Sequence, residues 1–133
     1  MIIKELPQED FELAKQLYCK CFQKSIQKTT IELKGTIVGM YIETELIGIA
    51  QIDYINNVFD NKIIGYINSF CIKEEYRHQG YGDLLLKECI CMIQKNGGNM
   101  INMTSNKKRI YAHKLYDKNH FEIVDTILLK KDL

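Results

Sequence analysis

The segment from residue 63 to residue 96 restricts the fold more than any other part of the chain. It begins with the apolar run IIGYINSFCI, which is typical of a buried strand. It ends with YGDLLLKECICMIQKN, where apolar residues recur at helical spacing before the helix-ending pair Gly97 and Gly98. A second apolar run, NMINM, follows at once. Residues 63–103 therefore predict a strand–helix–strand unit with two parallel strands.

The rest of the chain predicts further helices and strands around this unit. Residues 8–23 carry apolar side chains at helical spacing, and residues 107–119 predict a second, shorter helix. The β-branched runs at 35–44 and 46–55 predict a hairpin, and FEIVDTILLKK at 121–131 predicts a final strand. The expected order is β-α-β-β-β-α-β-α-β. We therefore expect an α/β (α+β) fold with a mixed, mostly antiparallel central sheet and flanking helices.

Composition narrows the class of protein. The chain has 133 residues, 46% of them hydrophobic, which predicts one domain over residues 1–133. The net charge of +1 and the scattered lysines give no indication of nucleic-acid binding. No apolar run is long enough to span a membrane, and the first residues do not resemble a secretory signal, so we expect a cytoplasmic protein.

The five cysteines predict reduced thiols in the cytosol, because their number is odd and their surroundings are apolar. The pairs Cys19/Cys21 and Cys89/Cys91 could suggest a metal site. Residues two apart on a helix point away from each other, however, and no histidine is suitably spaced. We therefore expect no metal.

The turn RHQGYG at residues 77–82 carries the chemistry of the strand–helix unit. A helix N-terminus exposes unpaired N–H groups and about half a positive charge, so it attracts anions. Gly80 and Gly82 would let a phosphate approach the backbone, and Arg77 could add a charged hydrogen bond. The alternative is a plain turn with an exposed arginine. Neither a P-loop nor a complete dinucleotide fingerprint is present.

RHQGYG followed by DLLLKECI resembles the acetyl-CoA-binding motif Arg/Gln-x-x-Gly-x-Gly/Ala of the GNAT superfamily of N-acetyltransferases. TSNKKRIYAHKLYDKNHFE at 104–122 resembles the second signature of that family. The resemblance covers residues 2–130 and implies the acyl-CoA N-acyltransferase fold, with acetyl-CoA as co-substrate. It implies that the strand segment before the turn, the turn itself and one asparagine bind that co-substrate: Phe70, Cys71, Ile72, Arg77, His78, Gln79, Gly80, Tyr81, Gly82, Asp83 and Asn106.

Several of these residues also have simpler structural interpretations. Phe70, Cys71 and Ile72 suit a buried strand, and Asn106 suits the cap of a helix starting near Lys107. The carboxylate of Asp83 is expected to turn outward, away from a bound phosphate. KNHF replaces the usual Leu-Gly-Phe, so Asn119 is expected to adopt the left-handed conformation that ends the helix.

Tyr116 corresponds to the family's tyrosine that protonates the departing thiolate of CoA. A phenol with a pKa near 10 is protonated at neutral pH and can serve as this acid. The alternative is a core tyrosine on an apolar helical stripe with Ala112 and Leu115. No general base can be assigned, because the strand YINSFCI contains no carboxylate; water held by Asn68 or Ser69 is the remaining candidate.

The sequence thus predicts an N-acetyltransferase in which a primary amine attacks acetyl-CoA directly. A non-catalytic acyl-CoA-binding or regulatory module of the same fold is the alternative, favoured by the missing base. A nucleotide-binding domain is a third, weaker hypothesis. The acceptor is unidentified, although residues 23–34 are expected to shape its pocket. The protein could be a monomer or a homodimer.

Overall fold

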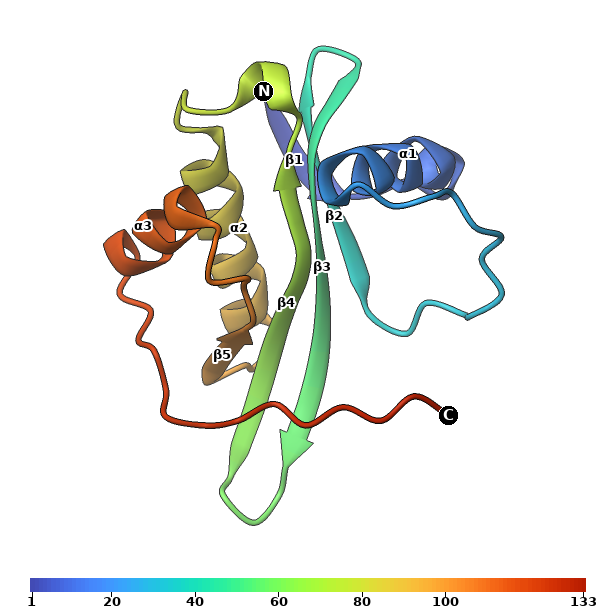
Figure 1. The fold of residues 1–133 in the computed structure, drawn as a ribbon. Helices are drawn as coiled ribbons and strands as arrows, with labels where there is room; N and C mark the ends of the chain where they lie inside the picture. The colour runs from blue at the N-terminus through green and yellow to red at the C-terminus, as the bar shows by residue number, and fades with distance from the viewer.

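The computed structural model describes residues 1–133 and is built on one mixed sheet (Figure 1). The strands lie in chain order across it: β1 (Ile2–Glu5), β2 (Thr36–Ile42), β3 (Glu45–Asn57), β4 (Lys62–Ile72) and β5 (Met100–Met103). The first four strands are antiparallel neighbours, and β5 runs parallel to β4. The predicted mixed, mostly antiparallel sheet is therefore confirmed.

Three helices cover the two faces of this sheet: α1 (Phe11–Phe22), α2 (Tyr81–Lys95) and α3 (Ile110–Lys118). Two short 3₁₀ turns, Gln8–Asp10 and Glu74–Tyr76, precede α1 and α2. Helix α1 lies on one face, whereas α2 and α3 lie on the other (Figure 1). No helix has the length and apolar character needed to cross a membrane.

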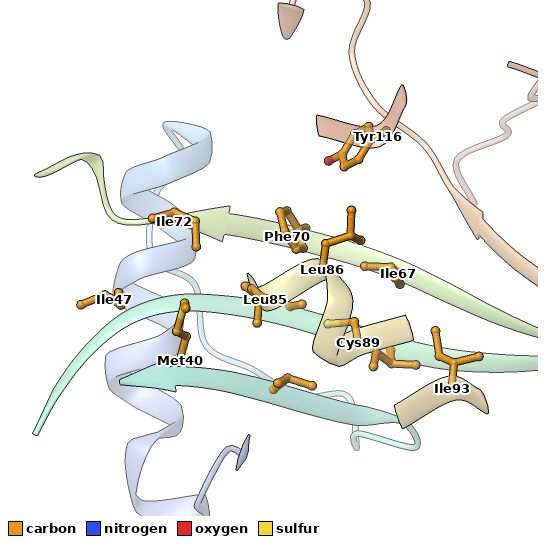
Figure 2. Packing of buried hydrophobic residues seen from close by; sticks show 13 residues of the cluster. Met40, Ile47, Ile67, Phe70, Ile72, Leu85, Leu86, Cys89, Ile93 and Tyr116 are labelled. Carbon is orange, nitrogen blue, oxygen red and sulfur yellow. The ribbon is translucent and has the colours of Figure 1, made fainter. Parts of the chain in front are cut away.

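Each face of the sheet has its own hydrophobic core. On the α2 face, 13 buried residues pack together, among them Leu85 and Leu86 of α2 and Ile67 of β4 (Figure 2). On the α1 face, a smaller cluster of 6 buried residues includes Leu17 and Cys71. Alternating side chains of the central strands supply both cores. The larger core therefore fixes α2, and with it the turn that precedes the helix.

Leu86→Ala should lower the free energy of unfolding by about 2–5 kcal/mol, because the side chain is fully buried and its loss leaves a cavity. Leu84 is the matched control on the same helix, since it is 43% exposed. Leu84→Ala should change stability by about 0.5 kcal/mol or less. Urea unfolding of both variants with reduced thiols measures the difference. Equal losses would contradict the packing described here.

The predicted final strand at residues 121–131 is wrong. After α3 the chain has no helix or strand, and the apolar residues from Ile123 to Leu129 are exposed. β-branched residues favour a strand only where a neighbouring edge supplies hydrogen bonds and burial. This segment forms no ladder with β5, so its apolar pattern has nothing to pair with.

Strand β4 contains a bulge close to its end. Gln51 of β3 pairs with Asn68 and Ile49 pairs with Cys71, so Ala50 alone lies opposite two residues of β4, Ser69 and Phe70. Ser69 has a φ of 55°, a conformation that non-glycine residues rarely adopt. Bulges of this kind re-aim side chains. Here the bulge lies directly before the segment Phe70–Ile72.

Candidate active site

Strands β4 and β5 pair only along part of their length. Their register runs from Ile64 opposite Met100 to Ile67 opposite Met103 and then stops. The last five residues of β4, 68–72, therefore have no strand neighbour on the β5 side. Phe70, Cys71 and Ile72 lie in this stretch. Phe70 and Ile72 pack on the α2 face and Cys71 packs on the α1 face, so all three side chains are buried.

The turn between β4 and α2 presents a row of unused backbone donors. The amides of residues 78–83 form no backbone hydrogen bond, and no side chain caps the N-terminus of α2. The first bonded amide of the helix is that of Leu84, which donates to the carbonyl of Gly80 at 3.3 Å. Six consecutive free N–H groups at a helix N-terminus form a binding site suited to an anion.

The two glycines of this turn serve different purposes. Gly80 has a φ of 89°, and a Cβ there would meet no atom within 4 Å, so the backbone conformation rather than packing requires glycine. At Gly82 a Cβ would lie 3.4 Å from Leu115 of α3 and 3.8 Å from Ile72. Gly82 therefore lies where α2, α3 and the end of β4 meet.

The carboxylate of Asp83 is held away from the free amides. Lys87 donates to it at 2.7 Å and the side-chain amide of Asn119 donates at 2.9 Å. These hydrogen bonds lower the pKa of Asp83 below its ordinary value. Asn119 itself does not adopt the left-handed conformation expected of it. His120 does so, with a φ of 66°, and the Asn119 side chain links α3 to Asp83 of α2.

The other polar side chains of the turn face in several directions. Arg77 donates from Nε to the carbonyl of Ile72 at 2.8 Å and lies 3.6 Å from the sulfur of Cys21 on α1. The ring of His78 packs edge-on against that of Tyr111 of α3, with ring centroids 4.6 Å apart. The side-chain amide of Gln79 donates a hydrogen bond to the carbonyl of Glu75. Tyr81 packs against Tyr76. The side chains of the turn therefore have partners within the protein, whereas the amides of residues 78–83 have none.

Tyr116 lies on the inner side of α3, opposite Phe70 of β4, with ring centroids 6.3 Å apart (Figure 2). The side chain is buried, and burial raises the pKa of the phenol, although the charge of Arg109 acts in the opposite direction. None of the hydrogen bonds in the structure involves its hydroxyl group. Tyr116 therefore offers a protonated, unpartnered hydroxyl beside the unpaired end of β4.

The loop before α3 contributes Ser105, Asn106 and Arg109. Asn106 accepts a hydrogen bond from the amide of Lys108 at 2.9 Å, although α3 begins at Ile110 rather than near Lys107. The hydroxyl of Ser105 is buried without a partner. Arg109 stacks over Phe22 of α1 at 5.5 Å. Sequence reasoning missed Ser105 and Arg109, because nothing distinguishes them within TSNKKR.

An opening with a volume of about 660 Å³ lies on the α1 face. It lies between α1, the loop after α1 and the centre of the sheet, and its lining includes Lys15, Lys24, Lys28, Gln51 and Ser69. Ser69 thus joins this opening to the β4 bulge. The loop at residues 24–29 contributes to the lining, within the range where the sequence predicted an acceptor pocket.

A carboxylate lies close behind this opening. Asp53 of β3 accepts hydrogen bonds from Gln51 at 3.0 Å and from Asn68 at 3.1 Å. Asn68 in turn accepts a hydrogen bond from Ser69 at 3.1 Å. Strand β4 contains no acid, and Asp53 lies on β3, so the sequence did not indicate it. The pairing of β3 with β4 brings it beside Asn68.

Comparison with known proteins identifies the family. The sequence model of the Acetyltransferase (GNAT) family matches residues 2–121. The chain belongs to the GNAT acetyltransferase family. No significant match was found among curated proteins. The resemblance noted in the sequence is thus confirmed.

Solved structures share the fold of this GNAT acetyltransferase at low sequence identity. An aminoglycoside acetyltransferase from an uncultured soil metagenomic sample has a TM-score of 0.83 at 13% identity, covering 99% of this chain and 95% of that chain. A ribosomal-protein-alanine N-acetyltransferase from Brucella melitensis biovar Abortus 2308 has a TM-score of 0.82 at 11% identity, covering 98% of both chains. A transcriptional regulator from Bacillus halodurans C-125 has a TM-score of 0.83 at 17% identity, covering 99% of both chains.

Proposed function

We propose that this GNAT acetyltransferase uses acetyl-CoA to acetylate a primary amine by direct attack. The observation that carries the proposal is the row of six free amides at residues 78–83, beside the unpaired end of β4 and close to Tyr116. An anion site suits a pyrophosphate, and an unpaired strand edge suits an arm that contains amides. A protonated phenol suits a thiolate leaving group, which needs a proton.

The residues present fit acetyl-CoA. When bound, acetyl-CoA supplies a thioester as the activated acyl group and an anionic pyrophosphate as an anchor. The backbone of Gln79 to Asp83 offers donors to the anchor, and the backbone of Phe70 to Ile72 offers an open edge. The unpartnered hydroxyl of Ser105, next to Asn106, is a further polar group in need of a partner. Arg77 and His78 are proposed to contribute at the rim of the turn.

In this proposal Tyr116 acts as the general acid, because its raised pKa keeps the phenol protonated at neutral pH. The attacking amine must lose a proton, since an ordinary alkyl ammonium has a pKa near 10.4. Asp53 is proposed to accept that proton through water between Gln51 and Ser69. The hydrogen bonds from Gln51 and Asn68 hold its carboxylate in place behind the opening.

Asp53→Asn should lower kcat/KM by about 100-fold at pH 7, the smaller end of what a general base contributes. The defect should shrink as the pH approaches the pKa of the acceptor amine, because the amine then loses its proton to solvent. Asp60→Asn is the matched control, since Asp60 is an exposed carboxylate that bonds only within its own turn. Rates measured from pH 6 to 10 test this role. A defect that does not change with pH would argue against Asp53 as the base.

The proposed acceptor carries a negative group beside its amine. Lys15, Lys24 and Lys28 line the opening on the α1 face, and hydrogen bonding to Tyr18 raises the pKa of Lys24, which stays charged. Three positive charges favour a carboxylate or phosphate on the acceptor and oppose a polycation. Amino acids and acidic peptides fit this pocket better than polyamines or aminoglycosides.

The function is tested by release of free CoA thiol when the purified chain is mixed with acetyl-CoA and an amine panel. The panel contains amino acids, acidic peptides, polyamines and aminoglycosides. Acetylation of at least one amine, faster than without protein, supports the proposal. Binding of acetyl-CoA in a thermal-shift assay without turnover of any amine would favour the non-catalytic acyl-CoA-binding module. Stabilisation by ATP but not by CoA would favour a nucleotide-binding domain.

We propose further that residues 1–133 form one acetyltransferase domain that works in the cytoplasm as a monomer or homodimer. All five cysteines are free thiols, which suits a reducing compartment. The exposed apolar residues after α3 are available for contact with a second copy. Sedimentation of the full chain would distinguish the two oligomeric states.

A further inference from the structure

Two thiols from distant parts of the chain meet at the end of β4. Cys21 lies in the last turn of α1, and Cys71 lies in β4 on the face that α1 covers. Cys71 is a buried member of the cluster on the α1 face, and Cys21 packs against that cluster. The sulfur of Cys21 lies 3.8 Å from the carbonyl oxygen of Ile72, the residue next to Cys71. Neither is in a disulfide. Two thiols placed at the same end of β4 in this way are a potential disulfide.

The sulfur of Cys21 has positive neighbours. Arg77 lies 3.6 Å from it, and the bond from Arg77 Nε to the carbonyl of Ile72 holds the guanidinium in that position. Arg109 adds a second charge from the loop before α3. The neighbouring Cys71 and these two arginines lower the pKa of Cys21 below its ordinary value, although burial acts in the opposite direction. The thiolate of Cys21 is therefore favoured more than that of an ordinary exposed cysteine.

Cys71 has the opposite character. It is 4% exposed, and both the neighbouring Cys21 and its burial raise its pKa. Cys71 thus remains a thiol that solvent does not reach directly. In a pair of this kind the reactive thiolate is oxidised to a sulfenic acid, and the protected thiol then attacks that sulfur to form a disulfide.

A small oxidant has a path to Cys21. An opening of about 150 Å³ is lined by Cys21 and Arg77, together with Lys20, Lys73 and Glu74. Hydrogen peroxide is small enough to enter a space of this size, whose polar lining also suits water. The remaining cysteines lack this combination. Cys89, for example, is fully buried on the α2 face, and burial raises its pKa to about 12.

We propose that Cys21 and Cys71 form a peroxide-responsive dithiol that closes into a disulfide between α1 and β4. The Cys21 thiolate attacks one oxygen of hydrogen peroxide, the O–O bond breaks, and hydroxide leaves as the sulfur becomes a sulfenic acid. The sulfur of Cys71 then attacks that of Cys21. The S–S bond forms, the S–O bond breaks, and the Cys71 proton leaves with the hydroxyl group as water. A thiol reductant reverses the reaction.

The test treats the reduced full chain with hydrogen peroxide, blocks remaining thiols, and identifies tryptic peptides by mass. Trypsin releases Cys21 within residues 21–24 and Cys71 within residues 63–73, while Cys19 lies in residues 16–20. The expected product joins the first two peptides with loss of two hydrogen atoms. Cys21→Ser should abolish it. Cys71→Ser should stop at a Cys21 sulfenic acid that dimedone traps.

Arg77→Gln should slow the oxidation of Cys21 several-fold at pH 7 and by less at pH 9, because the thiolate is less favoured without the guanidinium. Cys91→Ser is the control variant, since Cys91 lies on α2 away from the pair, and it should leave the cross-link unchanged. Oxidation of Cys91 as fast as that of Cys21, or loss of Cys21 to sulfinic acid without a cross-link to Cys71, would overturn the proposal. The readout is a mass, so it does not depend on acetyltransferase activity.

Discussion

Tyr116→Phe should reduce kcat by about 10²–10⁴-fold, the range that a general acid contributes. The substitution removes only the hydroxyl, which has no partner in the protein, and keeps the ring that packs against Phe70 and Phe121. Stability and affinity for acetyl-CoA should therefore remain close to those of the unmodified chain. Steady-state rates with the best acceptor, together with a CoA titration, measure the two effects separately.

Tyr111→Phe is the matched control, because Tyr111 lies on the same helix but is 69% exposed. It should keep the full rate. The pH profile supplies a second check on Tyr116. Burial raises the pKa of the Tyr116 phenol above its ordinary value near 10. The phenol is therefore protonated at neutral pH, and the activity that depends on its proton is lost only as the pH rises through the raised pKa. If Tyr116→Phe retained its rate, Tyr116 would be a core residue and the proton would come from elsewhere.

Gly82→Asp should abolish measurable binding of acetyl-CoA. A carboxylate would then stand among the free amides, and two unit charges 4 Å apart repel by about 4 kcal/mol at an effective dielectric constant near 20. That energy corresponds to almost a thousandfold in Kd. The fold should tolerate the change, because a Cβ at this position makes only ordinary contacts with Leu115 and Ile72. Calorimetric titration with CoA measures the loss.

Gly82→Asn separates charge from bulk, since asparagine has nearly the size of aspartate without its charge. It should weaken binding far less than Gly82→Asp does. The native Asp83 does not cause the same repulsion, because Lys87 and Asn119 hold its carboxylate away from the amides. Equal affinities of the aspartate and asparagine variants would show that the anion of the cofactor binds elsewhere.

The sequence predicted the strand–helix–strand unit well, because local patterns determine it. The helix stop at Gly97 and the turn at Gly80 require φ values of 84° and 89°, which glycine adopts without strain. The final strand could not be predicted in the same way. Its apolar residues need a partner edge, and whether one is available depends on the whole sheet rather than on the segment itself.

The parts of the candidate site that are formed by backbone groups could be predicted from the sequence. The parts that are formed by side chains were harder to predict. The amides of residues 78–83 follow from the position of a helix start, and the resemblance indicated Tyr116. Asp53 and Arg109 were missed, because each reaches the site only through long-range packing. Asp53 needs the register of β3 against β4, and Arg109 needs the loop before α3 to reach Phe22 at the end of α1. Neither relation is encoded in a short stretch of sequence.

The extra residue in β4 has a consequence for the whole site. In a regular strand, side chains alternate strictly, so Ile67 would share its side with residues 69 and 71. Instead Ile67, Phe70 and Ile72 line the α2 core, while Ser69 and Cys71 face α1. The bulge thus reverses, from this point on, which side of the sheet the odd- and even-numbered side chains of β4 face. If the same residues formed a regular strand without the bulge, Phe70 would turn away from Tyr116 and Cys71 would turn away from α1.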